Sequence, residues 1–116
     1  MRQDADKGFF SRLASFNDSF SSRLPATLER IGVVAAGLDP RAPAPAADEL
    51  QAMLHTVAGS AATFGYRGLG HHARALEQRL RVLMAFDAVA ASDWAMWVAE
   101  LDAFVEAGRR DPRALN

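Results

Sequence analysis

The segment LQAMLHTVAGSAATFG, residues 50–65, decides the fold because its apolar residues recur at alternating steps of four and three. These residues are Leu50, Leu54, Val57, Ala61 and Phe64. Such steps place side chains on one face of an α-helix, whereas a half-buried strand would show strict alternation. The pattern predicts a helix over about residues 48–64, with Gly65 as its C-cap.

The same periodicity extends to both sides of this segment. The apolar series are Phe9, Leu13, Phe16 and Phe20; Leu24, Leu28, Ile31, Ala35 and Leu38; Leu69, Ala73, Leu76, Leu80 and Leu83; and Trp94, Trp97, Leu101, Phe104 and Val105. They predict N-terminal helices over about residues 5–38, a helix over about 67–86 and a last helix over about 92–109. No alternating run and no Asn-Gly or Asp-Gly turn occurs, so no strand is predicted.

Turn and capping residues set the expected boundaries. Pro25 should start a new helix or kink the first one. The segment DPRAPAPAA, residues 39–47, contains three prolines and is expected to be a loop. Asp48 and Glu49 would then lie at a helix N-terminus, where the helix dipole favours acidic side chains. Ser92 is expected to be the N-cap of the last helix.

Composition and helix count together predict the architecture. The chain has 116 residues, of which 50% are hydrophobic and 23% charged, as in one globular domain. We predict a single all-α domain over residues 1–116, an antiparallel four-helix bundle with an N-terminal helical extension. An extended helical hairpin and a two-chain bundle are the alternatives. Cysteine is absent, which excludes a disulfide scaffold, a thiolate metal site and a cysteine nucleophile.

The charge balance and the apolar runs limit the classes of partner. The chain has thirteen Lys and Arg and fourteen Asp and Glu, which give a net charge of −1. The excess of basic residues that is typical of a nucleic-acid-binding domain is therefore missing. No apolar stretch reaches the roughly 20 residues of a membrane span, and the N-terminus lacks the pattern of a signal peptide. We expect neither nucleic acid nor membrane as a partner, and a cytoplasmic location.

One histidine lies on the face of its helix that points away from the apolar stripe. His55 is therefore predicted to be exposed, with Gly59 one turn later on the same side. A glycine inside a helix lowers the stability of the helix by about 1 kcal/mol relative to alanine, so its presence at position 59 requires an explanation. One explanation is that a residue without a side chain leaves His55 accessible. The alternatives are a close approach of two helices at Gly59 and a histidine that is simply solvated.

Metal binding is a weaker hypothesis. His71 and His72 are adjacent, but the chain has no Glu-x-x-His and no His-x-x-x-His pair, so ligands at helical spacing are missing. Trp94 and Trp97 are predicted to be core residues rather than part of a ligand cage. No Gly-rich phosphate loop occurs. We expect no metal site and no cofactor.

Residues 54–65, LHTVAGSAATFG, resemble the signature of histidine-containing phosphotransfer (HPt) domains. That signature is a histidine, an apolar residue two later, a glycine four later, small residues, an apolar residue and another glycine. The matching residues are His55, Val57, Gly59, Ser60, Phe64 and Gly65. The run HARALEQRL after Leu69, with its Leu76-Glu77 pair, and the N-terminal segment with Leu24-Pro25 are also similar to members. Many members carry lysine three residues after the histidine, where this chain has Ala58.

The resemblance implies a phosphoryl carrier rather than an enzyme with an ATP site. His55 would accept a phosphoryl group from the aspartate of a receiver domain and pass it to another aspartate. The expected partners are response-regulator receiver domains or a hybrid sensor histidine kinase, and the expected state is a monomer. The receiver would supply the Mg²⁺ and the lysine that neutralise the transferred group.

Supporting residues are predicted around His55. Ala58, Gly59 and Ala62 would form a flat docking surface, with Gln51 and Ser60 nearby.

If the next helix pairs antiparallel, Glu77 and Gln78 should lie near His55, and either could fix the tautomer of its imidazole. Ordinary solvated side chains are the more frequent alternative for these two. Arg74 and Arg81 are expected on the exposed side, where they could attract an acidic receiver surface. Two rival functions stay open: a non-phosphorylated helical adaptor that docks receiver or kinase domains, and a metal- or cofactor-binding bundle.

Overall fold

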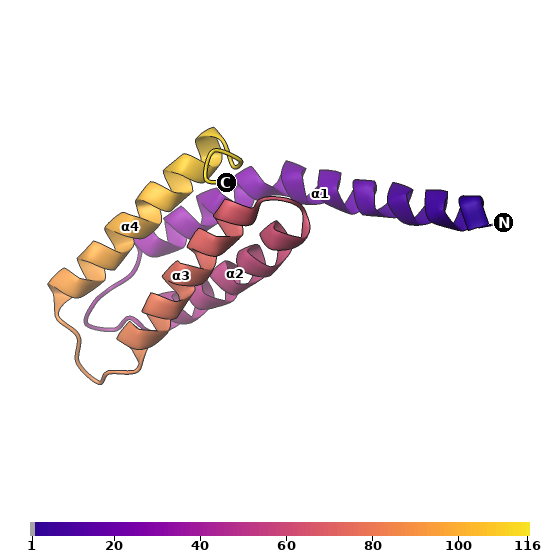
Figure 1. Cartoon of the computed structure of the whole chain (residues 1–116). Helices are drawn as coiled ribbons and strands as arrows, with labels where there is room; N and C mark the ends of the chain where they lie inside the picture. The colour runs from indigo at the N-terminus through magenta and orange to yellow at the C-terminus, as the bar shows by residue number, and fades with distance from the viewer. Residues whose placement is uncertain (1) are drawn as a thin grey trace.

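Four α-helices make up the computed structural model, which describes residues 2–116 and, among them, the side chains of residues 8–12 and 14–116. The helices are α1 (Arg2–Ala36), α2 (Ala44–Thr63), α3 (Arg67–Met84) and α4 (Ala91–Arg110) (Figure 1). Residues 2–116 contain no strand, so the predicted all-α fold is confirmed. The side chain of Leu13, a member of the first apolar series, lies outside the described residues.

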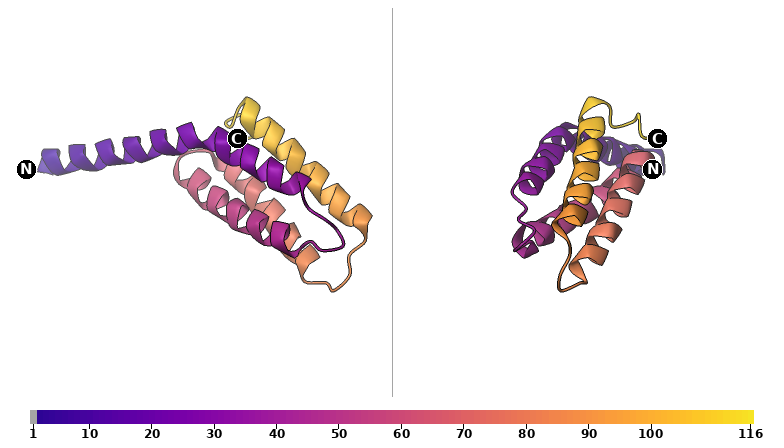
Figure 2. Two further views of the ribbon diagram at one scale, coloured as in Figure 1. Left: turned by 180° about the vertical axis from the view of Figure 1, so that it is seen from behind. Right: turned by 90° about the vertical axis from the view of Figure 1, so that its left-hand side faces the viewer.

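The helices form an antiparallel bundle in which each one contacts two others. α1 packs against α2 and α4, and α3 packs against the same two helices from the other side (Figures 1 and 2). The N-terminal part of α1 projects well past the end of the bundle (Figure 2), which makes the molecule 61 Å long and only 26 Å by 20 Å across. The predicted four-helix bundle with an N-terminal extension is confirmed.

A single core collects the apolar stripes of all four helices. Its buried side chains are Leu24, Leu28, Ile31, Val34 and Ala35 of α1; Ala47, Leu50, Leu54, Val57, Ala58 and Ala61 of α2; Tyr66 before α3; Leu69, Ala73, Leu76 and Leu80 of α3; and Trp94, Trp97, Leu101, Phe104 and Val105 of α4. The indole Nε1 of Trp97 donates to the carbonyl of Leu76 at 3.0 Å, which satisfies the buried indole and ties α4 to α3. Both tryptophans are core residues, as predicted.

Pro25 lies inside α1, which continues through it as one helix of 35 residues. The alternative of a separate helix starting at Pro25 is therefore wrong. Proline has no N–H for the carbonyl of Ser21, and its ring crowds that carbonyl. This local loss explains why the helix changes direction where the extension meets the bundle (Figure 2).

The predicted loop of residues 39–47 is shorter than expected, because α2 begins at Ala44 rather than near residue 48. Pro43 is the N-cap residue and another proline lies in the first turn, where the N–H groups that proline lacks have no helical partner anyway. The first turn of α2 therefore holds no acidic residue. Glu49 instead pairs with Arg30 of α1 at 3.0 Å.

Asp39 stabilises the remaining α1–α2 loop. Its Oδ1 accepts the backbone N–H of Arg41 at 2.9 Å. This hydrogen bond favours the ionised carboxylate and lowers the pKa of Asp39 below its ordinary value.

Gly65 ends α2 as predicted. It has φ of +87°, and the backbone N–H of Tyr66 donates to the carbonyl of Ala61 at 2.8 Å, the bond expected when glycine follows the last helical residue. The C-terminal residue reinforces the turn: Asn116 Oδ1 accepts the N–H of Gly68 at 2.8 Å, and its Nδ2 donates to the carbonyl of Gly65 at 3.3 Å. The turn between α2 and α3 is thus short and braced.

The last helix begins one residue before the predicted start, and Ser92 is not its cap. The N-cap position is Ala90, and no side chain caps this end of α4. The prediction for Ser92 is wrong because the helical backbone already includes Ala91. None of the helices within residues 2–116 is long and apolar enough to cross a lipid bilayer.

Candidate functional site

His55 lies near the middle of α2 with 73% of its side chain exposed. Leu54 comes one residue before His55 and Val57 two residues after it. Both are buried and belong to the stripe of α2 that faces the core. The step of 100° per residue turns His55 away from that stripe. The structure thus places the imidazole on the outside of the bundle.

Glu77 of α3 lies beside this imidazole. Its Oε1 is 3.1 Å from Nδ1 of His55, and only 7% of its side chain is exposed. Glu77 is adjacent in sequence to the core residue Leu76, so it lies at the edge of the α2–α3 interface. The reading of Glu77 as an ordinary solvated side chain does not fit this burial.

The contact selects one tautomer of His55. An ionised carboxylate can only accept a hydrogen bond, so Nδ1 carries the proton and donates a hydrogen bond to Glu77. In a neutral imidazole the other nitrogen, Nε2, then holds an unprotonated lone pair. Since the ring is mostly exposed and Nδ1 is engaged with Glu77, Nε2 is the nitrogen available to a reaction partner.

Arg81 completes the group. Its Nη2 lies 3.0 Å from the same Oε1 of Glu77, so one buried carboxylate oxygen contacts the imidazole and also forms an ion pair with the guanidinium. A buried carboxylate is costly unless it is paired, and Arg81 provides that pairing from a half-exposed position. Sequence reasoning predicted Arg81 only as a surface charge. The Glu77-to-Arg81 spacing of four residues in a helix was the available signal.

Gly59 lies one turn after His55 and has open space where its side chain would be. A Cβ built on Gly59 would meet nothing within 4 Å, so the alternative of a close helix approach at Gly59 is wrong. That role belongs to Gly70 of α3, whose Cβ would lie 3.1 Å from the carbonyl oxygen of Ala58. The packing therefore gives no reason for glycine at position 59.

Ala58 does not belong to the exposed surface predicted for it. It is 2% exposed and part of the core. The physical reason is the close approach of α3, which Gly70 permits and which covers the Ala58 side of α2. The alanine at this position is thus a small residue of the core.

The remaining predicted residues divide between the surface and the margin of the core. Ala62 is exposed, Gln51 and Ser60 are half-buried, and Gln78 is exposed. Helical geometry brings four residues to the same side as His55, one or two turns away: Gln51, Ala52, Gly59 and Ala62. We call His55 and these four residues the His55 face. It contains small side chains next to the imidazole and no charged group of α2.

His71 and His72 are both exposed at the start of α3. They line a pocket of about 790 Å³ that Ala62, Gly65 and Leu115 also border. Within the described residues, no three His, Asp or Glu side chains come together in a way that would hold a metal ion.

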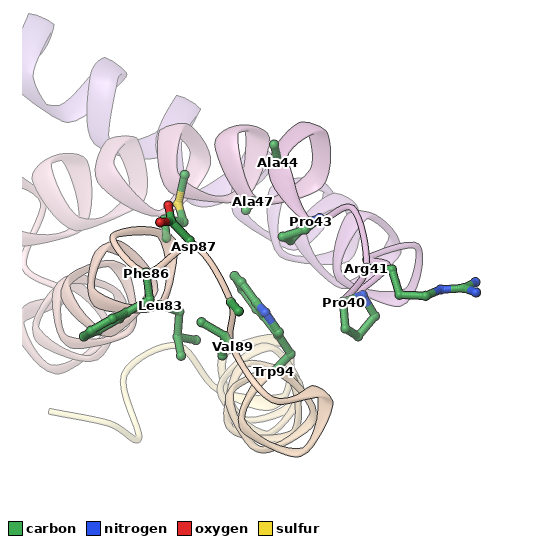
Figure 3. Close-up of a pocket in the computed structure, with 12 residues that line it drawn as sticks. Pro40, Arg41, Pro43, Ala44, Ala47, Leu83, Phe86, Asp87, Val89 and Trp94 are labelled. Atoms are coloured by element: carbon green, nitrogen blue, oxygen red, sulfur yellow. The ribbon is translucent and has the colours of Figure 1, made fainter.

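A second pocket lies at the end of the bundle where the α1–α2 and α3–α4 connections meet (Figure 3). It measures about 330 Å³, and its walls include Pro40, Pro43, Phe86 and Trp94. Arg41 points away from it in Figure 3. No residue of the His55 face, nor Glu77 or Arg81, lines this pocket, so the reactive group and the enclosed space are separate features.

The fold agrees with comparison to known families. The model of the Hpt domain matches residues 17–110, most of the chain, and the protein belongs to this family. Hpt domains are helical bundles that carry phosphoryl groups on histidine in phosphorelays, and they interact with receiver domains and kinases. Comparison with curated proteins and with solved structures gave no match.

Proposed function

We propose that His55 accepts a phosphoryl group from the phospho-aspartate of one receiver domain and passes it to the aspartate of another. Membership of the Hpt family supports the class of reaction. The observation that carries the assignment to His55 is its contact with Glu77, 3.1 Å from Nδ1, on a ring that is otherwise exposed.

The transfer follows from this geometry. Nε2 of His55 attacks phosphorus in line, the new N–P bond forms, and the P–O bond to the receiver's aspartate breaks with that carboxylate as the leaving group. The ring gains positive charge as the bond forms, and the Glu77 carboxylate beside Nδ1–H stabilises it. In the return step an aspartate carboxylate attacks the same phosphorus and Nε2 leaves.

The receiver is expected to supply the Mg²⁺ ion and the lysine that neutralise the phosphoryl oxygens. We propose no cofactor and no ATP site for this chain, which would act as a carrier. The His55 face is compatible with a receiver that supplies these groups, because Gly59 and Ala62 leave room for another domain to bring its aspartate against the imidazole. The cytoplasmic location expected from the sequence stays a prediction.

A transfer assay tests the proposal. The full chain is mixed with a receiver domain that carries radioactive phosphoryl-aspartate, and the label on this chain is followed by gel. We expect an acid-labile, base-stable label that is lost in His55→Gln and kept in His71→Gln and His72→Gln, which change the other two exposed histidines. If receivers that label another Hpt domain never label this chain, the proposal is wrong and the adaptor function is favoured.

A further inference from the structure

The N-terminal part of α1 carries large apolar side chains that the bundle leaves uncovered. Phe9, Phe10 and Phe16 are 56%, 64% and 63% exposed, on the segment that projects past the bundle (Figures 1 and 2). The match to the Hpt family begins at residue 17. These aromatic side chains therefore belong to a part of the chain that precedes the family's bundle.

Their spacing is that of a helix-pairing seam. Phe9, Leu13, Phe16 and Phe20 follow steps of four, three and four, and at about 100° per residue all four positions fall within about 60° of the helix circumference. This is the apolar repeat of a coiled coil. Phe20, at the base, packs against Phe64 and Tyr66 with ring centroids 5.4 Å and 5.6 Å away. The seam thus starts at the bundle core, and its outer members Phe9 and Phe16 lie uncovered by the described residues.

We propose that a second copy of this chain covers the seam. Residues 2–23 of the two copies pair as a short two-helix coiled coil, with the seam of one against the seam of the other. This segment carries four basic residues, Arg2, Lys7, Arg12 and Arg23, and three acidic residues, Asp4, Asp6 and Asp18, so its net charge is too small to oppose self-association. This proposal replaces the monomer expected from the sequence.

Charge complementarity selects the antiparallel arrangement. In the heptad register that puts Phe9 and Phe16 at d, Asp6 occupies an a position. Parallel pairing would place Asp6 against Asp6 of the second copy in the seam, two like charges at close range. Antiparallel pairing centred between residues 13 and 16 places Asp6 opposite the exposed Arg23 of the second copy. It places Phe9 against the part of the half-buried Phe20 of the second copy that Phe64 and Tyr66 leave uncovered. Each of these contacts occurs twice because the pair has two-fold symmetry.

Sedimentation velocity on the full chain over a range of concentrations tests the association. We expect the mass to rise from 12.5 kDa toward twice that value as concentration increases. The double variant Phe9→Glu, Phe16→Glu is expected to stay at the monomer mass and to keep the melting temperature that the wild type has at concentrations where it is a monomer, since both side chains lie outside the core. The matched control Val33→Glu, Phe86→Glu changes two exposed apolar residues of the bundle, 57% and 64% exposed, and should still dimerise.

A monomer at every concentration, or a dimer that survives the Phe9 and Phe16 substitutions, would overturn the proposal. Orientation is tested separately with a spin label on Ala5→Cys, since the chain has no other cysteine. Antiparallel pairing predicts labels about 30 Å apart, from 1.5 Å per residue along the helix. Labels separated by little more than the interhelical distance of about 10 Å would show parallel pairing and contradict the antiparallel arrangement.

Discussion

One carboxylate oxygen, Oε1 of Glu77, lies 3.1 Å from Nδ1 of His55 and thereby joins the outer face of α2 to the edge of the core. The same atom is 3.0 Å from Nη2 of Arg81. An exposed imidazole on a helix surface would otherwise rotate freely and exchange tautomers. The buried carboxylate restricts both, while the guanidinium offsets the cost of its burial.

Replacement of Glu77 by glutamine should slow phosphoryl transfer without removing the nucleophile. Because the amide can donate to Nδ1 as well as accept from it, the proton is no longer confined to Nδ1. We expect a decrease of roughly 10- to 100-fold in transfer rate, the scale of a misplaced reacting group. Nitrogen-15 NMR of the imidazole should show a shift toward the Nε2–H tautomer. The control Gln78→Ala changes the exposed neighbouring residue and should leave rate and tautomer as they are; an equal loss there would contradict a specific role for Glu77.

Arg81→Gln should weaken both stability and transfer, because Glu77 would lose its cationic partner while it stays buried. We expect a loss of about 1 kcal/mol, since the guanidinium is itself half-exposed. Urea denaturation and the transfer assay measure the two effects. Arg74, two turns earlier on the same side of α3, provides a matched control: Arg74→Gln removes the same charge and should change neither by much. Similar effects of the two substitutions would mean that only the net charge of the surface matters.

Gly59 and Gly70 should respond in opposite ways to an added side chain. Gly59→Ala is expected to stabilise the protein by up to about 1 kcal/mol, because the Cβ enters open space and alanine favours the helix. Gly70→Ala should destabilise it by about 1–3 kcal/mol, since its Cβ would press on the α2 backbone. Thermal unfolding of the two variants decides this.

Access to His55 is probed with a longer side chain at the same glycine. Gly59→Gln should fold normally and receive phosphoryl groups more slowly, because the side chain obstructs the His55 face. Normal transfer by the folded Gly59→Gln variant would show that this face is not the docking surface.

A lysine introduced at position 58 should not improve the protein. Ala58 is 2% exposed, so the longer side chain must force its way out between α2 and α3, at a cost of about 1–3 kcal/mol. Ala62→Lys, on the exposed side of the same helix, should change stability by no more than about 0.5 kcal/mol. An Ala58→Lys variant that is as stable as the wild type and faster in transfer would contradict this account.

The sequence was sufficient for the bundle and for the histidine, because helical periodicity reports directly which side of a helix faces the core. It was insufficient wherever the answer depended on how closely two helices approach. Ala58 looked like a surface residue from its own helix alone, and only Gly70, twelve residues later, brings α3 over it. Ser92 was misjudged for a related reason, because local capping signals compete with the packing of the whole element.

The same limit explains what was missed at the site. Glu77 and Gln78 are neighbours in sequence and both polar, and nothing in their order tells which one meets His55. The choice is made by the rotation of α3, which its apolar stripe fixes when Leu76 and Leu80 enter the core. Glu77 then lies at the interface and Gln78 in solvent. The pairing of Arg81 with Glu77 follows from the same rotation.

The braced turn at Gly65 restricts insertions and deletions between His55 and Glu77. His55 lies ten residues before Gly65 and Glu77 twelve residues after it, so two helical arms of similar length bring the imidazole and the carboxylate to the same level. One residue added or removed between them would move Glu77 by about 1.5 Å along its helix and about 100° around it. The number of residues in this stretch is therefore as constrained as the identity of the histidine, and Asn116 helps to enforce that count from the other end of the chain.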